Sequence, residues 1–510
     1  MSAHPTILDV ERFRGSMLRW LGLYFDESRQ DFLSEILRRR VDGHGGTPGN
    51  YLAALEAPDR HREELRILAQ ELTVTETSFF RNPDQIRAFS EVVLPDRISA
   101  RSAHRRLRIL SAGCASGEEA YTLAACVRDC PGVDGWDISV RGIDVNIAML
   151  GKAAAARYSS WSLRQTPVPV RTRLFQAEGR DFVLDHAVRD KVRFEERNLV
   201  EDDPAFWQPG SFDIIFCRNV LMYFAPETAR AVIARMACSL TPGGFLFLGH
   251  AETLRGLSSD FHLRHTHETF YYQRKDAPES LNWAGMASYA ASLPNAPLDA
   301  LSNPDDGWID RIRHASQRIQ VLTDSLPARA RPALAVVVGA ARPALDLRDA
   351  VDLLGREQFS EAQSVLSALP SDSAHDPEVL LLTAVLHTHG GNLISAEEVC
   401  AELLELDELN AGAHYLMALC RESAGDDRDA VNHDRIAAYL DPGFAMPRLH
   451  LGLLARRAGD HEAARQDLRQ ALMLLEREDS SHLLLFGGGF SRSALMTLCR
   501  AELAACGGKA

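Results

Sequence analysis

The chain of 510 residues lacks the patterns that mark several common classes of protein. It has no apolar run long enough to span a bilayer, and its first residues carry charges where a secretory signal needs an apolar core. Its nine cysteines form no C-x-x-C pair and show no zinc-ligand spacing. We therefore expect a cytoplasmic protein with reduced thiols and no bound metal.

Charge is distributed unevenly along the chain. The net charge is −14, but from Leu345 onward there are 14 basic and 27 acidic residues, or −13, which leaves −1 for the first 344 residues. Neither part is basic enough to indicate binding of nucleic acid. The acidic part is typical of a solvated or protein-binding module.

A short strand that ends in small residues is predicted at Leu107–Gly113, LRILSAG. Small residues after a strand let the backbone approach a ligand, and the helix that follows presents free N–H groups. The loop lacks the full G-x-G-x-x-G of a dinucleotide site. The acidic pair Glu118 and Glu119 would repel a pyrophosphate but suits a partly cationic ligand such as S-adenosylmethionine. A plain strand-turn-helix without a ligand is the alternative.

Two further strands are predicted to end in polar side chains. VRGIDVN contains Asp144, placed where a carboxylate can accept both ribose hydroxyls, although Asp at a strand end is also a common helix N-cap. Ser211–Tyr223, SFDIIFCRNVLMY, places Cys217, Arg218 and Asn219 directly after an apolar strand. Ligands bind outside the carboxyl ends of strands in parallel α/β sheets, so we expect a site there rather than only a buried strand.

Six motifs follow one another in a characteristic order: ELTVTETSFFRNP, SAGCASGEEAYTLA, GIDVNIAMLGKA, FEERNL, FDIIFCRNVLMYF and LTPGGFLFLGHAE. In this order and spacing they resemble the CheR family of chemoreceptor glutamate methyltransferases, over roughly Ile7 to Arg274. One departure is Glu76, where many members carry Asn. The resemblance implies a multidomain fold, with an all-α N-terminal domain before an α/β Rossmann-like S-adenosylmethionine-dependent methyltransferase domain that carries a small antiparallel β-subdomain.

The resemblance also implies a set of site residues. Arg81 and Tyr223 would orient the acceptor carboxylate, with Glu119 on the donor's ammonium or adjacent polar groups and Asp144 on its ribose. The residues expected to bind S-adenosylmethionine, or its product S-adenosylhomocysteine, are Thr75, Thr77, Arg81, Gly113, Glu119, Asp144, Asn198, Leu199, Cys217, Arg218 and Asn219.

A basic run ends the second predicted helix and consists of Arg38, Arg39 and Arg40. In the family, a basic helix here faces the acidic helical bundle of the receptor, so the resemblance implies substrate binding. Cations near a helix C-terminus are favourable whatever the function, which is the structural alternative.

A glutamate acceptor would need no general base. Its carboxyl group titrates near about 4.3 and is already ionised at pH 7. This agrees with the lack of any His-Asp pair or activated Ser that could be nominated. The guanidinium of Arg81 can hold a carboxylate bidentately and fix one oxygen in line with the sulfonium methyl.

The acidic part contains an internal repeat of 34 residues. Small residues recur at two positions of this repeat, namely Ala350, Ala384, Ala418 and Gly452, and twelve residues later Ala362, Ala396, Ala430 and Ala464. Gly391, Gly425 and Gly459 recur on the predicted turns. Because paired helices must approach closely at such positions, the pattern predicts an all-α tetratricopeptide-repeat domain rather than a generic helical bundle. A loop and capping helix are expected at Ser481–Ala505.

The predicted domains are an N-terminal helical domain at 1–90, a methyltransferase domain at 91–275 with its β-subdomain at about 168–193, a linker with a helical segment at 276–344, and repeats at 345–510. The loop around Gly179 looks shorter than in members that grip a receptor's C-terminal tether peptide. This resembles the tether-independent class, unless it is only a trimmed turn. The repeats would bind a protein partner and localise the enzyme.

The predicted function is O-methylation of receptor glutamates in a bacterial chemosensory pathway. A catalytically inactive scaffold acting through its repeats is the alternative, against which the retention of Arg81, Glu119, Asp144 and Tyr223 argues. A small-molecule or rRNA methyltransferase usually carries a base, an N/D-P-P-Y-type loop or a basic face, and none is found. A dehydrogenase is disfavoured because the glycine fingerprint is missing.

Overall fold

The computed structural model describes residues 4–57, 61–275, 347–356, 358–370 and 373–507. These residues belong to two compact units, of which one precedes and the other follows residues 276–346 in the sequence. The linker predicted at 276–344, with its helical segment, lies in that stretch, outside the described residues. Within the described residues, no helix combines the length and apolar character needed to cross a bilayer.

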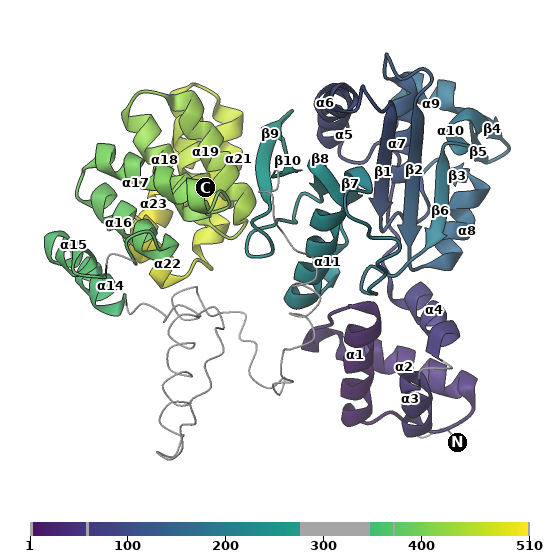
Figure 1. Ribbon diagram of the computed structural model, residues 1–510. Helices are drawn as coiled ribbons and strands as arrows, with labels where there is room; N and C mark the ends of the chain where they lie inside the picture. The colour runs from purple at the N-terminus through teal and green to yellow at the C-terminus, as the bar shows by residue number, and fades with distance from the viewer. Residues whose placement is uncertain (1–3, 58–60, 276–346, 357, 371–372, 508–510) are drawn as a thin grey trace, which may run out of the picture. The chain divides into compact units, whose positions relative to one another are not determined.

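The first unit begins with a bundle of helices, purple in Figure 1: α1 (Ile7–Leu21), η1 (Glu27–Arg29), α2 (Gln30–His44), α3 (Pro48–Glu56) and α4 (His61–Leu72). Helix α1 starts at a capping box between Thr6 and Asp9 and ends at Gly22, whose φ of 70° lies in the left-handed region. The apolar faces of the helices bury Phe13, Leu37 and other side chains in one core. The prediction of an all-α N-terminal part is confirmed.

A seven-stranded sheet forms the centre of this unit, in the order β6-β2-β1-β7-β8-β10-β9. Its strands are β1 (Arg106–Ala112), β2 (Asp137–Asp144), β6 (Val192–Glu196), β7 (Phe212–Cys217), β8 (Leu240–Leu248), β9 (Phe261–Thr266) and β10 (Thr269–Arg274). The first five in the spatial order are parallel, and β10 and β9 add an antiparallel edge. Strand β7 is buried at every residue, as expected of a parallel strand covered on both faces.

Helices accompany the strands and supply the rest of the core: α5 (Pro83–Ala88), η2 (Phe89–Val93), α6 (Leu94–Ala100), α7 (Glu118–Asp129), α8 (Ile147–Ala155) and α11 (Pro226–Ser239). Phe89 of η2 packs edge-on against Phe216 of β7, which stacks on Phe247 of β8. The Thr-Pro-Gly-Gly segment of the motif LTPGGFLFLGHAE lies within β8, where the pairing with β7 shifts register. The Rossmann-like α/β prediction is confirmed.

A second, three-stranded antiparallel sheet has the order β3-β5-β4. Its elements are β3 (Arg157–Ser159), α9 (Val168–Leu174), β4 (Phe175–Glu178), β5 (Asp181–Leu184) and α10 (His186–Arg189). The small sheet was predicted at about 168–193, but it starts earlier, the residues from 168 to 174 are helical, and Val192 belongs to β6 of the large sheet. The sequence hides β3 because a strand of three residues is too short to show alternation.

The second unit is helical throughout its described part: α14 (Arg348–Gly355), α15 (Phe359–Ser367), α16 (Pro377–His389), α17 (Leu393–Leu406), α18 (Ala411–Ser423), α19 (Asp427–Leu440), α20 (Ala445–Arg457), α21 (His461–Leu475), α22 (Ser480–Phe486) and α23 (Arg492–Ala505). Successive helices from α14 to α21 pack as four pairs. The eight small residues at the two helical positions of the repeat are all buried, and a Cβ on Gly452 would lie 2.6 Å from Cγ of Leu468. The tetratricopeptide prediction is confirmed. The segment expected to hold one capping helix forms two, α22 and α23.

Candidate active site

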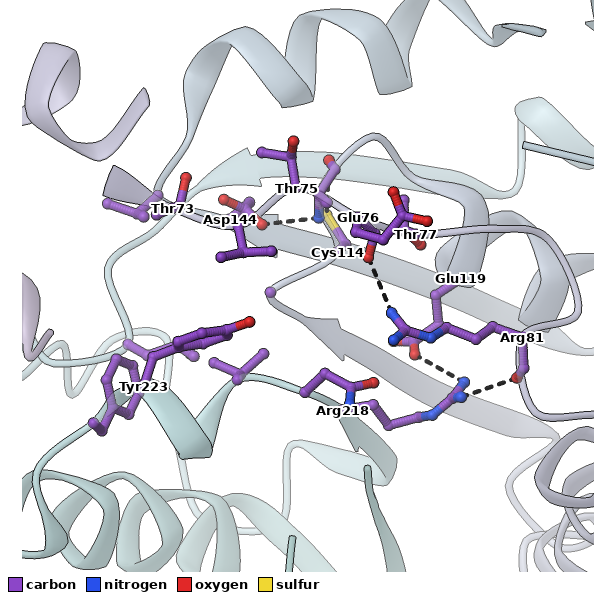
Figure 2. A pocket seen from close by; sticks show the side chains of 18 of the residues that line it. Thr73, Thr75, Glu76, Thr77, Arg81, Cys114, Glu119, Asp144, Arg218 and Tyr223 are labelled. Atoms are coloured by element: carbon purple, nitrogen blue, oxygen red, sulfur yellow. Dashed lines mark hydrogen bonds and ion pairs between the residues drawn. The ribbon is translucent and has the colours of Figure 1, made fainter. Parts of the chain in front are cut away.

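A pocket opens at the carboxyl ends of β1, β2 and β7 (Figure 2). The predicted site residues that line it are Thr75, Thr77, Arg81, Gly113, Glu119, Asp144, Asn198, Leu199, Arg218, Asn219 and Tyr223. The described lining does not include Cys217, which is fully buried at the end of β7. The topology thus brings together side chains that are up to about 150 positions apart in the sequence, as expected at the carboxyl edge of a parallel sheet.

The loop between β1 and α7 forms one wall of the pocket. Gly113 has a φ of 73°, and a Cβ there would lie 2.5 Å from Cγ2 of Val220. The backbone N–H groups of Ala115 and Asn146 donate to the two carboxylate oxygens of Asp144, each at 2.8 Å. Burial raises the pKa of Asp144, although these backbone hydrogen bonds oppose the shift. Each oxygen keeps a second lone pair, which a hydroxyl group could use.

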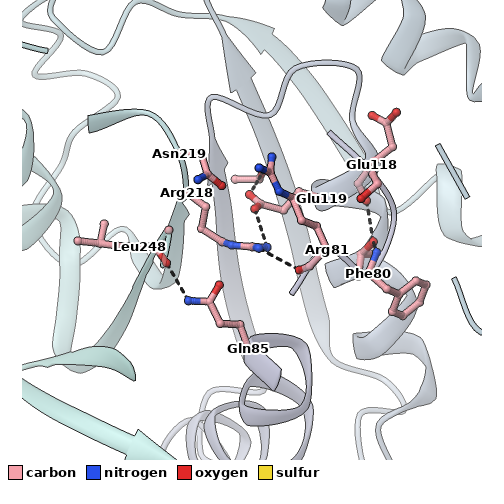
Figure 3. Close-up of polar contacts among 12 residues, drawn as sticks. Phe80, Arg81, Gln85, Glu118, Glu119, Arg218, Asn219 and Leu248 are labelled. Atoms are coloured by element: carbon pink, nitrogen blue, oxygen red, sulfur yellow. Dashed lines mark hydrogen bonds and ion pairs between the residues drawn. The ribbon is translucent and has the colours of Figure 1, made fainter. Parts of the chain in front are cut away.

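A buried ion pair joins α7 to the end of β7. Nη1 of Arg218 donates to Oε2 of Glu119 at 3.2 Å, and the hydroxyl of Ser111 donates to Oε1 at 2.7 Å. Burial raises the pKa of Glu119 and lowers that of Arg218, and the ion pair opposes both shifts. Nη2 of Arg218 donates to the backbone carbonyl of Arg81 at 2.9 Å (Figure 3). The pair therefore fixes the backbone from which the Arg81 side chain extends.

Arg81 and Tyr223 reach the pocket from different sides (Figure 2). Nη1 of Arg81 donates to the carbonyl of Glu76 at 3.0 Å. Tyr223 ends the short helix η3 (Leu221–Tyr223), and its carbonyl accepts a hydrogen bond from the N–H of Tyr24 at 2.8 Å. Its ring packs against the core of the N-terminal helices. A cation and a phenol thus face one pocket that also contains two partly buried carboxylates, Glu119 and Asp144.

Asn198 connects the pocket to the N-terminal helices. Its Nδ2 donates to the carbonyl of Trp20 at 2.7 Å, and its Oδ1 accepts from the N–H of Val200 at 3.1 Å. The next carbonyl, of Leu199, accepts from Arg235 at 2.6 Å. Both ends of the Asn198 amide are therefore bound to backbone, which holds this wall of the pocket in place.

Comparison with known proteins agrees with this arrangement. The family model described as "CheR methyltransferase, SAM binding domain" matches residues 75–270. The chain is 33% identical to "Chemotaxis protein methyltransferase 2" of Vibrio cholerae over 274 residues, which are 52% of this chain and 93% of that protein. The chain belongs to the CheR methyltransferase family. It is an S-adenosylmethionine-dependent protein methyltransferase.

Members of the family differ in how much of this chain they cover. "Chemotaxis protein methyltransferase 1" of Pseudomonas aeruginosa is 29% identical over 274 residues, or 52% of this chain and 98% of that protein. "Probable biofilm formation methyltransferase WspC" of Pseudomonas putida is 26% identical over 461 residues, or 90% of this chain and 97% of that protein. The likeness to the latter therefore extends into the repeats.

Glu76 departs from the residue that many CheR family members carry, and the structure shows its partner. Its Oε1 accepts from Nη2 of Arg164 at 2.6 Å, and this guanidinium lies 4.4 Å from the centre of the Trp161 ring. The Glu76 side chain remains about half exposed. A carboxylate at this position is therefore matched by a cation from the segment that follows β3.

The basic run on α2 divides into two kinds of residue. Arg40 makes two hydrogen bonds to Glu64, at 2.8 and 2.7 Å, and Tyr51 donates to the same carboxylate. These hydrogen bonds raise the pKa of Arg40 against its partial burial. Arg38 and Arg39 are more exposed, at 39% and 54% of their side chains; Arg38 pairs with Glu35 and Asp42 of its own helix, and Arg39 pairs with Glu71 of α4. Arg40 thus stabilises the helical bundle, and the other two present their charge at its surface.

Sequence reasoning missed two residues that support the site. Arg164 gave no signal, because its partner Glu76 lies 88 positions away. Glu252 gave a weak signal, because it lies three positions after Gly249, which follows the last residue of β8. Its carboxylate accepts hydrogen bonds from the loop that precedes Tyr223. A buried acid just past a strand end could have drawn attention to it.

Proposed function

We propose that this enzyme methylates glutamate side chains on the cytoplasmic helical bundle of a chemotaxis-type receptor, in the adaptation of a chemosensory pathway. The observation that carries the proposal is the convergence of Arg81 and Tyr223 on a pocket that also holds Glu119 and Asp144. The names of the relatives, which are chemotaxis methyltransferases, support the class of substrate.

The residues present fit S-adenosylmethionine. Glu119 offers a partly buried carboxylate to an ammonium group, and Asp144 offers two oxygens to the ribose hydroxyls. The rest of the proposed donor site is Thr75, Thr77, Gly113, Asn198, Leu199, Arg218 and Asn219, with Cys217 behind the wall. When bound, the donor supplies an electrophilic methyl group on a sulfonium centre.

The acceptor chemistry requires orientation rather than proton transfer. A glutamate carboxyl group, with a pKa of about 4.3, is already ionised at neutral pH. Arg81 can hold such a carboxylate through its remaining N–H donors, and the phenol of Tyr223 can direct one oxygen. Such fixed orientation can contribute about 7–11 kcal/mol to lowering a barrier. A need for orientation alone agrees with the lining of the pocket, which includes the guanidinium of Arg81 and the phenol of Tyr223. The described lining residues contain no acid-base dyad.

The receptor contact is proposed to lie on the bundle of N-terminal helices. Arg38 and Arg39 lie at the surface of α2 in ion pairs with carboxylates, which an acidic helical partner would have to replace. The hairpin between β4 and β5 turns over only Gly179 and Arg180, which supports the tether-independent class. The repeats then bring the enzyme to a protein partner in the cytoplasm, with no role for nucleic acid or for membrane insertion.

The test is transfer of label from S-adenosylmethionine to the cytoplasmic fragment of each receptor encoded beside this protein. We expect alkali-labile incorporation, as methyl esters give, into at least one fragment, and its loss in Arg81→Ala. If wild-type protein binds the donor but labels no fragment, the inactive-scaffold alternative is favoured instead.

A further inference from the structure

We infer that Glu252 is a positioning residue for methyl transfer, acting through the backbone of the loop 219–222 that leads to Tyr223. This inference rests on the proposed function of the pocket. The described lining of the pocket does not include Glu252, whose side chain is buried behind it with 5% of the residue exposed.

The carboxylate of Glu252 binds four backbone N–H groups. Oε2 accepts from Asn219 at 2.7 Å and from Gly249 at 2.6 Å. Oε1 accepts from Val220 at 2.8 Å and from Met222 at 3.3 Å. Hydrogen bonds from N–H groups to an ionised carboxylate are among the stronger ones in proteins. One side chain therefore joins the end of β8 to three residues of the loop that follows β7.

The loop needs such a clamp because its backbone is strained. Asn219 has a φ of 59°, in the left-handed region that non-glycine residues seldom adopt. The carboxylate leaves no room for a side chain at position 249, since a Cβ on Gly249 would lie 2.7 Å from Oε2 of Glu252 and 2.9 Å from the nitrogen of Asn219. Glycine and carboxylate together hold the strained turn against the end of β8.

The loop 219–222, which Glu252 holds, contributes to both the proposed donor side and the proposed acceptor side of the pocket. Val220 packs against the loop between β1 and α7, called the donor loop from here on, where its Cγ2 occupies the space that a Cβ on Gly113 would need. The backbone carbonyl of Val220 accepts a hydrogen bond from the N–H of Tyr223 at 3.2 Å. This hydrogen bond positions Tyr223 on the side of the pocket where the acceptor carboxylate is proposed to bind. Oδ1 of Asn219 is buried without a hydrogen-bond partner among the described residues, although Asn219 lines the pocket. Glu252 thus fixes three contributors to the site without touching it.

A merely structural role is the competing explanation, and Asp213 provides a matched control. Asp213 is also a buried carboxylate, 2% exposed, and it lies near the start of β7, at the opposite end of that strand from the loop that Glu252 binds. It accepts from the backbone N–H of Arg108 at 2.9 Å and from Nε of Arg101 at 2.6 Å. It lies outside the described lining of the pocket.

The first test separates turnover from donor binding. In Glu252→Gln the charge is lost and an amide NH₂ meets backbone donors, so we expect kcat on a receptor fragment to fall about 10²-fold, with affinity for S-adenosylhomocysteine changed by under about tenfold. Glu252→Asp keeps the charge and should recover part of that loss. Asp213→Asn should lower the melting temperature with kcat within about twofold of wild type. Wild-type kcat in Glu252→Gln, or an equal loss in Asp213→Asn, would overturn the inference.

The second test does not depend on the substrate. Amide hydrogen exchange at Asn219, Val220 and Met222 should be faster in Glu252→Gln than in wild type and unchanged in Asp213→Asn. Unchanged amide exchange in Glu252→Gln would contradict the proposal that Glu252 holds the loop. If the Gln variant does not fold, the same exchange measurement is made on Glu252→Asp and interpreted in the same way. If wild-type protein methylates no receptor fragment, the proposed function fails while the exchange result still judges the clamp.

Discussion

Arg81 and Asp144 share a pocket but are anchored to different parts of it. Arg81 is held through its carbonyl by Arg218 and through its guanidinium by the carbonyl of Glu76, whereas Asp144 is held by the N–H groups of the donor loop and of the start of α8. The two residues should therefore affect different kinetic constants when removed.

Arg81→Ala should reduce transfer much more than donor binding. Losing hydrogen bonds from a charged group costs about 1.5–3 kcal/mol, or about 10- to 150-fold in rate. Asp144→Ala should instead weaken binding of S-adenosylhomocysteine by a similar factor. Calorimetry and initial rates measure the two effects, with Arg87→Ala, an exposed arginine on α5, as the control. If both variants lost only donor affinity, Arg81 would be a donor-binding residue.

His450, in the repeat unit, should make stability depend on pH. Its Nε2 lies 2.8 Å from Glu422 and its Nδ1 lies 2.7 Å from the buried Asp434. Burial acts against its charge, but the two carboxylates outweigh burial and raise its pKa to about 9. Burial raises the pKa of Asp434 to about 7 despite the pairing with His450.

Both groups bind protons more tightly in the folded state, so each stabilises the fold less as pH rises. The histidine contribution is complete below its unfolded pKa of about 6.5 and is lost as pH rises through about 9. The melting temperature of the repeat unit should therefore fall between pH 6.5, the ordinary pKa of histidine, and pH 9, the approximate raised pKa of His450. The fall should be reduced in the double variant His450→Gln, Asp434→Asn and retained in His461→Gln. A melting temperature that is constant or rises over this range contradicts the account.

At the scale of elements, the sequence predicts the strands, loops and helical repeats that follow from a local pattern of residues. It does not predict hydrogen bonds between a side chain and backbone groups that are distant in the sequence. The strand before Cys217 and the loop at Gly113 follow from an apolar run and a glycine, and the 34-residue repeat follows from its period. The binding of Glu252 to backbone N–H groups about thirty positions away, and of Asn198 to the carbonyl of Trp20, leaves no periodic signal. The order of the elements was therefore predictable, while the contacts that hold the site were not.

Gly452→Ala should destabilise the repeat unit by about 1–3 kcal/mol, the usual effect of overpacking. Its Cβ would lie 2.6 Å from Cγ of Leu468 on the partner helix α21. Gly355→Ala is the matched control, because a Cβ there has its nearest contact at 3.8 Å, with Leu484. It should be neutral or stabilising by up to about 1 kcal/mol. Denaturant unfolding measures both, and equal stability of the two variants would show that the helix pair tolerates a wider spacing.

At the scale of the whole molecule, the proposed chemistry lies in the first unit and the acidic repeats lie in the second. We propose that the repeats act by localisation. Tethering an enzyme to a partner near clustered substrates can raise avidity by about two to four orders of magnitude without any new contact at the active site.

A chain cut near Asn303, within the undescribed stretch, should therefore bind donor and methylate a soluble receptor fragment at a rate within about twofold of the full chain. It should methylate receptors poorly in cells. The two proteins are compared on the same fragment at equal concentration. A large change in turnover in either direction would mean that the repeats regulate the active site.

The central claim is that this enzyme forms methyl esters on receptor glutamates, and peptide mass spectrometry of a methylated receptor fragment tests it most directly. The account predicts a methyl group on glutamate side chains, which is removed by mild alkali and is absent after reaction with Arg81→Ala. Methyl groups on lysine, arginine or another residue, stable to alkali, would contradict it.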